Sequence, residues 1–479
     1  MTAPPLAEAL DASPAVRTAR AALADRPPAW VVGGAIRDAL AGREVTDVDL
    51  AVDGDAEDAA RAIASAADAH PFELSDEFAT WRVQSRAESW HVDVAPLRGD
   101  SIEADLGARD FTVDAIAVPL AGGAPLDPHG GAADLERGVL RAVGERSFAD
   151  DPLRILRAAR IAAALELTLD PGTVVLARDE AARAAEPAGE RQLAELRGIV
   201  AGPHPARGIE LLDELGATPV VLPELEALRG VEQNPYHHLD AHGHTIEVLE
   251  RAVALEADPS SALGDLSADV EALLAEPLAD ELTRAGGLRF AALFHDLGKP
   301  ETRTVAEGGR VLFIGHDEEG VRIVGEICSR LRASRRLTSY LQSLTRNHLR
   351  LGFLVHERPL SRRDVYEYLK RTAPETVDVT LLTVADRLAT QGPRTRSGAI
   401  DAHLELAREM ISEGLEWRRS GPPEAPIRGD ELAAELGIEP GPELGRLLGE
   451  IEAARFAGEI SSRDEAVELA RRALGNQNG

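Results

Sequence analysis

Two short patterns near the N-terminus constrain the fold of this chain most. An apolar run stops at Gly33-Gly34 and gives way to a helical pattern, and residues 47–50 then read Asp-Val-Asp-Leu. Side chains alternate between the two faces of a strand, so Asp47 and Asp49 project together while the residues next to them point into a core. The sequence therefore predicts a strand with two carboxylates on one exposed face.

These patterns also predict a chemistry. Two carboxylates on one open face suit Mg²⁺, which prefers hard oxygen ligands and keeps room for water and substrate phosphates. Glycines without a Cβ let backbone N–H groups approach a triphosphate, and the N-terminus of the following helix favours anions. Arg37 adds a bidentate clamp. We therefore expect a Mg²⁺ site at Asp47 and Asp49, beside a triphosphate site at Gly33, Gly34 and Arg37.

Short β-type runs continue beyond this region. The runs at 29–32, 48–52, 81–84 and 90–94 alternate with helical stretches such as 56–67, whereas almost no strand signal follows Pro152. In the last run, alternation places Asp93 opposite the valines, where we expect it to face the same metal ions as a third catalytic carboxylate. A small mixed sheet followed by helices predicts an α+β protein, and 479 residues predict two to four domains.

The charge pattern limits the partners. A net charge of −30 argues against general nucleic-acid binding, because contacts to phosphate use Lys and Arg. Residues 322–371, with twelve Lys and Arg against four acids, are a candidate RNA surface, although a solvated helix face is the open alternative. The single Cys328 suits a reducing compartment, and no run of about 18 apolar residues is found. We expect a cytoplasmic protein without a membrane partner.

Three motifs together resemble one family. Residues 33–38, 47–50 and Arg109-Asp110-Phe111-Thr112 are similar to class II CCA-adding enzymes and bacterial poly(A) polymerases, within the polymerase β-like nucleotidyltransferases. The resemblance implies that the partners are a tRNA 3′ end, CTP and ATP, and that Arg109 and Asp110 contact the ribose. Residues 127–135 resemble the family's hinge between head and neck. Asp114 stands where the family usually has Asn.

A base-reading helix is expected after the head. Asp151, Arg154 and Arg157 recur every three residues, broadly on one helix face. Asp accepts from the exocyclic amino group of cytosine or adenine, and Arg donates to the adjacent ring nitrogen, whereas guanine and uracil present the reverse pattern. In the family, such a helix is a protein template for CTP and ATP, and Asp150 here stands where Glu is usual. Residues 190–196 resemble the neck motif that supports this helix.

A second metal constellation has the order of ligands of an HD-type phosphohydrolase domain: His244, His295, Asp296 and Asp386, with His316 and His348 for a second ion. We expect a divalent metal here without predicting its identity. His237, His238 and His242 are interpreted as loop residues. In the family, this domain is associated with phosphatase or 2′,3′-cyclic phosphodiesterase action on RNA ends.

These interpretations combine into a domain order: an N-terminal extension (1–26), a nucleotidyltransferase head (27–145), a helical neck (146–230), an HD domain (231–400) and a helical RNA-binding tail (401–479). The leading prediction is template-independent CCA addition to tRNA by two-metal phosphoryl transfer. An A-adding enzyme or a poly(A) polymerase stays open, because base-reading residues alone do not fix when addition stops. A metal phosphohydrolase whose head only binds nucleotides is the alternative from another class.

Overall fold

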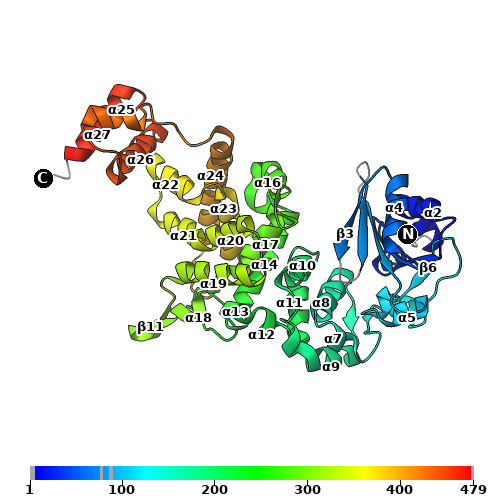
Figure 1. Cartoon of the computed structure of the whole chain (residues 1–479). Helices are drawn as coiled ribbons and strands as arrows, with labels where there is room; N and C mark the ends of the chain where they lie inside the picture. The colour runs from blue at the N-terminus through cyan, green and yellow to red at the C-terminus, as the bar shows by residue number, and fades with distance from the viewer. Residues whose placement is uncertain (1–5, 76–78, 86–89, 397, 476–479) are drawn as a thin grey trace. The chain divides into compact units, whose positions relative to one another are not determined.

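The computed structural model describes residues 6–75, 79–85, 90–396 and 398–475, and the chain divides into two compact units, 1–221 and 222–479. Strands gather in the first unit, and the second is almost entirely helical (Figure 1). The predicted α+β class is confirmed. No helix in the described ranges is both long and apolar enough to cross a membrane.

A six-stranded mixed sheet is the framework of the first unit. Its order is β3-β4-β5-β2-β1-β6, in which β2 and β5 are parallel and all other neighbours are antiparallel. The strands are β1 (Ala29–Val32), β2 (Asp47–Val52), β3 (Pro71–Ser75), β4 (Thr80–Gln84), β5 (His91–Pro96) and β6 (Ala117–Pro119). The four predicted runs form β1, β2, β4 and β5. The sequence does not predict β3, an edge strand with exposed apolar side chains, or β6, which is too short to show alternation.

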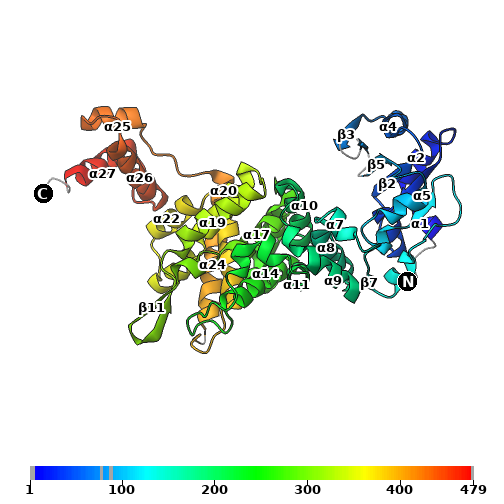
Figure 2. The same ribbon diagram turned by 60° about the horizontal axis from the view of Figure 1, so that its bottom comes forward.

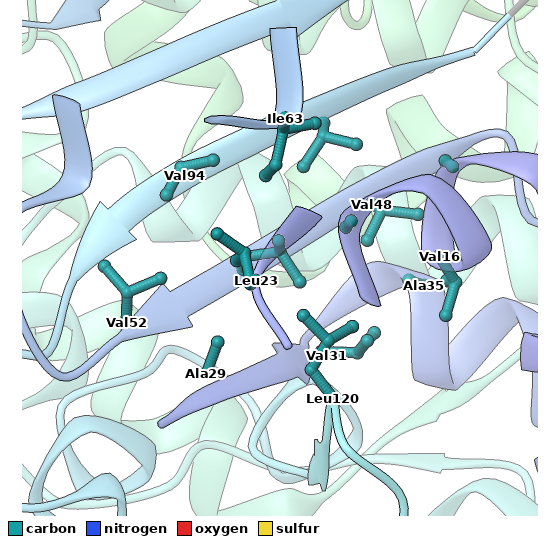
Figure 3. Close-up of a cluster of buried hydrophobic side chains, with 14 of the residues drawn as sticks. Val16, Leu23, Ala29, Val31, Ala35, Val48, Val52, Ile63, Val94 and Leu120 are labelled. Atoms are coloured by element: carbon teal, nitrogen blue, oxygen red, sulfur yellow. The ribbon is translucent and has the colours of Figure 1, made fainter. Parts of the chain in front are cut away.

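One face of this sheet is buried under helices. They are α1 (Leu6–Ala12), α2 (Pro14–Ala22), α3 (Gly34–Leu40) and α4 (Ala56–Ala66). Figure 3 shows Val31 and Val48 of the sheet in one cluster with Val16 of α2 and Ile63 of α4. The N-terminal helices are therefore part of the same core as the sheet. Apolar positions at helical spacing supply this contact, and burying each side chain contributes about 1.5–3 kcal/mol.

The opposite face of the sheet is only partly covered. Ala51 packs in a smaller cluster with Ile102 and Leu106 of α5 (Ile102–Gly107). Asp47 and Asp49 lie on the same face of β2 as Ala51 and are exposed. This face of β2 is therefore open at Asp47 and Asp49 and covered by α5 at Ala51. The two carboxylates consequently lie at the edge of the core.

The hinge-like motif holds the segment next to residues 109–112. Both Asp127 oxygens accept backbone N–H groups, from Gly131 at 2.7 Å and Ala132 at 3.0 Å, at the start of α6 (Gly131–Glu136). A Cβ on Gly131 would lie 1.9 Å from the Thr112 carbonyl oxygen, so only glycine fits there. Buried Asp134 accepts the Thr112 hydroxyl at 2.8 Å. This motif thus fixes the backbone that follows Arg109 and Asp110.

The neck consists of helices: α7 (Ser147–Asp150), α8 (Arg154–Leu165), α9 (Pro171–Glu180), α10 (Gly189–Val200), α11 (Pro205–Glu214) and α12 (Thr218–Val221). The short strands β7 (Val139–Leu140) and β8 (Thr168–Leu169) pair in parallel near its start. The sequence does not predict these strands, because two residues carry no periodic signal.

The second unit is a helical assembly with a separate C-terminal subdomain. Its first part contains α13 (Pro223–Glu226), α14 (Ala241–Ala257), α15 (Ser260–Leu263), α16 (Ser267–Leu274), α17 (Arg284–Phe294), α18 (Lys299–Thr302), α19 (His316–Arg330), α20 (Arg335–Asn347), α21 (Arg350–Leu354), α22 (Arg362–Thr372), α23 (Thr376–Ala389) and α24 (Ala399–Ser420). Two short hairpins interrupt it: β9 (Pro277–Ala279) with β10 (Leu282–Thr283), and β11 (Thr304–Ala306) with β12 (Arg310–Leu312).

The C-terminal subdomain has its own small core. After the Gly/Pro-rich linker near residue 421, α25 (Gly429–Leu436), α26 (Pro442–Phe456) and α27 (Arg463–Gly475) bury a shared apolar cluster. In Figures 1 and 2, α26 lies next to α22, and the two helices are in contact.

Candidate functional site

The three candidate carboxylates of the head lie on one face of two neighbouring strands. In the parallel pairing of β2 and β5, Asp49 is aligned with Asp93 and Asp47 with His91, so their side chains share a face. The His91 Nδ1 lies 3.1 Å from the Asp47 Oδ1. The structure thus brings together Asp47, Asp49 and Asp93 as the alternation of the sequence indicates.

Asp93 has a partner that the sequence analysis missed. The Arg82 guanidinium on β4 donates to both Asp93 oxygens at 2.7 Å, and this hydrogen bonding raises the pKa of Arg82. Cross-strand pairing of β4 with β5 places these two residues opposite one another. Asp47 and Asp49 are therefore the exposed carboxylates of the face, and Asp93 is held by Arg82.

Asp49 lies in an electrostatically crowded position. Desolvation by the surrounding protein raises its pKa, the nearby Arg109 guanidinium opposes this, and the carboxylates of Asp93 and Asp114 raise it further. Neighbouring carboxylates that disfavour each other's ionisation are stabilised by a cation. The donor set therefore fits a divalent ion, and two exposed protein carboxylates leave the other ligand positions to water and phosphate.

Gly33 connects the phosphate turn to this face. Its φ of +68° is in the region that favours glycine, and a Cβ there would lie 2.9 Å from Arg109 Nη1 and 3.4 Å from Asp49 Oδ2. The turn, the metal-binding strand and the Arg109 side chain therefore meet at one residue. Gly34 begins α3, and a Cβ on it would meet only the flexible end of Arg37.

Arg37 is paired within the protein. It donates to Asp114 at 2.6 Å and to Asp38 at 3.1 Å. Burial opposes the charged form of Arg37, yet these two carboxylates raise its pKa. Burial raises the pKa of Asp114 despite Arg37, and its Oδ2 has no hydrogen-bond partner among the described residues. The Asp at this position therefore forms a charged pair with Arg37 that an Asn could not form.

The predicted ribose-binding residues link the head to the neck. Arg109 donates to Asp105 of α5 at 3.0 Å, and Asp110 accepts Arg157 Nε of α8 at 2.7 Å. Burial acts against ionisation of Asp110, but the charge and hydrogen bond of Arg157 lower its pKa to about 2. The charge of Asp110 in turn raises the pKa of Arg157. One partly buried ion pair thus joins the Arg-Asp motif to the predicted base-reading helix.

The other predicted base-reading residues are also held in place. Arg154 donates to the backbone carbonyls of Ala108 at 2.8 Å and Arg109 at 3.4 Å. Asp151 accepts the Leu153 N–H at 3.1 Å and pairs with Arg191 of α10 at 3.1 Å. These contacts fix the start of α8 against both the head and the neck.

Glu195 of α10 supports the same helix. It accepts Arg160 at 2.6 Å and lies 3.7 Å from Arg157, so it braces two successive arginines of α8. Sequence motifs located this segment but not its individual partners, Arg191 and Glu195, because ion pairing across helices depends on packing that spacing does not reveal.

A second site in the helical unit is built on one buried aspartate. Asp296 Oδ2 lies 3.1 Å from His295 Nε2 and 3.7 Å from His244 Nε2, and its Oδ1 lies 3.3 Å from His316 Nε2 and 3.7 Å from His348 Nε2. The six predicted ligands form two groups of three: His244, His295 and Asp386, and Asp296, His316 and His348. Asp296 therefore lies between two potential ion positions.

Backbone contacts orient three of these histidines. The Nδ1 atoms of His295, His316 and His348 each lie within 2.8 Å of a carbonyl oxygen three residues earlier. Such a bond fixes the tautomer that presents the Nε2 lone pair to a metal. In the described ranges, the buried Nε2 atoms of His244 and His295 and Oδ2 of Asp296 make no hydrogen bond of suitable geometry, although ionisable groups lie close to each. The residues present therefore fit a divalent metal pair.

A cavity of about 710 Å³ opens onto this cluster. Lys299 Nζ forms an ion pair with Asp296 Oδ2 at 2.5 Å and donates to Gln233 Oε1 at 2.6 Å. Burial opposes ionisation of Asp296, but His295 and Lys299 lower its pKa far below its usual value. His237 packs edge-on against His244 at 4.8 Å and lies outside both groups of ligands. Burial lowers its pKa to about 3.

The positively charged segment 322–371 is largely neutralised in the fold. Glutamates of α24 pair with Arg358 and Arg362, and glutamates in and after α26 pair with Arg363 and Lys370. Arg346 pairs with Glu318 at 3.4 Å. Residues 358–370 are consequently a docking surface for α24 and the C-terminal subdomain, which argues against an open RNA surface there.

Comparison with protein families agrees with this geometry. Residues 29–141 match the poly(A) polymerase head domain, residues 166–228 match the probable RNA- and SrmB-binding site of polymerase A, and residues 242–391 match the HD domain. The matched ranges contain the head carboxylates, the part of the neck that follows α8, and all six histidine and aspartate ligands.

Individual proteins are similar over most of the chain. The A-adding tRNA nucleotidyltransferase of Deinococcus radiodurans is 35% identical over 92% of this chain and 94% of its own length, and the CC-adding enzyme of Thermus thermophilus is 33% identical over 91% and 92%. A solved CCA-adding enzyme with ATP has a TM-score of 0.62 at 21% identity, covering 96% of this chain and 94% of its own. The Thermotoga maritima CCA-adding enzyme complexed with tRNA-CCA has a TM-score of 0.56 at 20% identity, covering 98% of both chains.

Proposed function

Because this chain belongs to the class II CCA-adding enzyme and bacterial poly(A) polymerase family and carries its HD domain, we propose that it adds CCA to tRNA 3′ ends from CTP and ATP. The chain is a tRNA nucleotidyltransferase. What we propose is that it adds all three nucleotides, C, C and A. Because the proposed substrate is tRNA, we propose that the protein is located in the cytoplasm.

The observation that carries this function is the open face of β2, where Asp47 and Asp49 lie beside the Gly33 turn. We assign Mg²⁺ to these two carboxylates, with Asp93 oriented by Arg82. When bound, Mg²⁺ supplies Lewis-acid activation of the primer hydroxyl and neutralises charge on the triphosphate. The turn at Gly33 and Gly34 presents backbone N–H groups to the phosphates.

The remaining head residues position the nucleotide. Arg109, held by Asp105 against Gly33, is assigned to the ribose together with Asp110. Arg37 is assigned to the triphosphate. Its pairing with Asp114 fixes the guanidinium beside the turn, and two of its donors already have carboxylate partners. A phosphate therefore competes with Asp114 and Asp38 for Arg37.

Base selection is assigned to Asp151 and to Arg154 at the start of α8, although Asp151 lies before this helix in extended backbone and not on its face as the spacing predicted. Asp151 and Arg154 exchange their present partners, Arg191 and the carbonyls of residues 108 and 109, for the edge of cytosine or adenine. The Arg191 side chain is 43% exposed, so water can replace Asp151 as its partner after the exchange. Arg157 stays with Asp110 and Glu195 and keeps the helix attached to the ribose motif.

Addition of A alone is the second candidate, because one relative at 35% identity is an A-adding enzyme. Three tRNA substrates that end before CCA, after the first C or after CC, each incubated with CTP, ATP or both, separate the alternatives. Our proposal predicts that the shortest tRNA gains C, C and A. Extension of only the CC-ending tRNA would assign A addition, and extension that stops at CC would assign CC addition.

For the second unit, we propose phosphohydrolase action on RNA ends. The support is the buried ligand set around Asp296 and the cavity that reaches it. A bound divalent pair would supply a nucleophilic water and charge neutralisation at the phosphate. Release of phosphate from RNA that ends in a 2′- or 2′,3′-cyclic phosphate tests this activity, and it should disappear in His295→Ala while nucleotide addition persists.

A further inference from the structure

The cavity above Asp296 has the size of a site for one small molecule. Its volume of about 710 Å³ lies within the range of roughly 300–1,000 Å³ that is typical of ligand pockets. Asp296, His316, His348 and Asp386 are among its lining residues, so a ligand in the cavity reaches the metal-binding side chains. A single nucleotide fits such a space, and a duplex does not.

Large apolar side chains surround this polar centre. Phe353 of α21 is 64% exposed and Ile314, just before α19, is 80% exposed, and both line the cavity. Side chains of this size normally bury most of their surface, and exposed apolar groups around a polar cavity mark a ligand-binding site. A planar base is an apolar partner that stacks on an aromatic ring.

Two lining residues have polar atoms without partners. Within the described ranges, the buried Nε of Arg387 and the buried Nε2 of His403 have no hydrogen-bond acceptor or donor. This differs from the arginines of α22, which are paired with glutamates. A buried guanidinium N–H without an acceptor costs free energy of folding. A phosphate supplies the acceptor that the Arg387 Nε lacks.

From this arrangement we propose that the HD cavity recognises the terminal nucleotide of a single-stranded RNA end, with its base on Phe353 and its phosphate on Arg387. The inference rests on the proposed function of the second unit and adds the substrate feature and the two specificity residues. Arg387 lines the same cavity as Asp296, His316, His348 and Asp386, so a phosphate bound by Arg387 lies in the space that reaches the ligand cluster. An internal nucleotide of a paired stem is excluded, because stacking on Phe353 requires an unpaired base.

Calorimetric binding to the full-length protein tests this recognition without relying on turnover. The background is Asp47→Ala/Asp49→Ala, which silences the head, and the two probes are adenosine 2′-monophosphate and inorganic phosphate, each titrated without a divalent metal so that no hydrolysis occurs. Phe353→Ala should weaken binding of the nucleotide about tenfold and leave inorganic phosphate unchanged. Arg387→Gln should weaken both probes about tenfold.

Matched controls use exposed residues outside the cavity. Phe72→Ala on β3 and Arg335→Gln on α20 should change neither affinity. The inference is overturned if the parent protein does not bind the nucleotide, if Phe353→Ala weakens both probes equally, or if Arg387→Gln weakens neither.

A hydrolysis assay on the protein with its native head separates this inference from the proposed activity. Nucleotide binding with the expected variant pattern but no phosphate release would reject phosphohydrolase function and keep the recognition. Phosphate release with a KM unaffected by Phe353→Ala and Arg387→Gln would keep the activity and reject the recognition.

Discussion

Gly33 is the residue at which three parts of the head converge, because a side chain there would meet both Arg109 and Asp49. The sequence identified this glycine through the break in an apolar run, and the structure adds the reason for its identity. A side chain would be strained by the positive φ and would displace Arg109. Single residues with such multiple contacts are sensitive sites for mutation.

We predict that Gly33→Ala lowers nucleotide addition by roughly tenfold or more, since an alanine in this conformation costs about 1–2 kcal/mol before any displacement of Arg109. Gly34→Ala is the matched control. Its Cβ would meet only the end of Arg37, so the loss should be smaller. Initial rates of labelled CTP incorporation measure both variants, and equal losses would contradict the account.

The Asp110–Arg157 pair predicts a pH dependence of stability. The pKa of Asp110 in the folded protein is about 2, below the ordinary 3.8. The contribution of Asp110 to the free energy of unfolding is therefore full above about pH 4 and is lost as the pH falls towards 2. The shift corresponds to about 2 kcal/mol. Urea unfolding of wild type and Asp110→Asn should show a gap in unfolding free energy that is constant from pH 5 to 7 and narrows below pH 4.

The control for this experiment is Asp150→Asn, which changes an exposed acid paired with Arg146 on the same helix turn. Its unfolding free energy should differ little from wild type, because exposed pairs contribute about 0–1 kcal/mol. A gap for Asp110→Asn that stays the same down to pH 3 would show that the pair does not depress the pKa of Asp110.

At the scale of elements, the arginines of α22 serve to attach the C-terminal subdomain. Arg363 pairs with Glu450 and Glu459, and the Phe456 ring lies 5.7 Å from Tyr366 and 4.3 Å from the Arg362 guanidinium. Composition showed the excess of positive charge in this segment, but the acids that balance it come from α24 and the C-terminal subdomain. Only the fold brings them together.

We predict that Phe456→Ala loosens this attachment by roughly 1–3 kcal/mol, because it removes aromatic contacts with Tyr366 and Trp417 and the cation–π contact with Arg362. Limited proteolysis in the linker 421–428 should become roughly tenfold faster. Arg363→Gln removes only exposed ion pairs and should change the rate by less than about threefold. Unchanged cleavage of Phe456→Ala would contradict this docking.

The sequence predicts the strands and helices that are long enough to show a periodic pattern of apolar residues. Alternation located β2 and β5 and the shared face of Asp47, Asp49 and Asp93. It missed the two- and three-residue strands, since so few residues show no period, and it missed Arg82, whose role depends on its register with β5. The sequence also did not predict the ion pairs of Asp151 and Arg160, because their partners lie on α10, 35 to 40 residues away along the chain.

At the scale of the whole molecule, two candidate metal sites lie in separate compact units of one acidic chain. In the first unit the carboxylates lie on an open strand face, and in the second unit they lie between helices. The order of motifs along the sequence predicts both candidate metal sites, and the structure brings the residues of each site together. The cavity residues Phe353 and Arg387 belong to no motif and became visible only through their exposure and their missing partners.

The central claim is that the shared face of Asp47 and Asp49 performs nucleotide addition independently of the second unit. The most direct measurement is incorporation of labelled CTP and ATP into tRNA that lacks its terminal CCA. Asp47→Ala/Asp49→Ala should lower the rate by more than about a hundredfold, and His295→Ala/Asp296→Ala should leave it near wild type. Wild-type incorporation by the head variant, or its loss only in the second variant, would contradict this account.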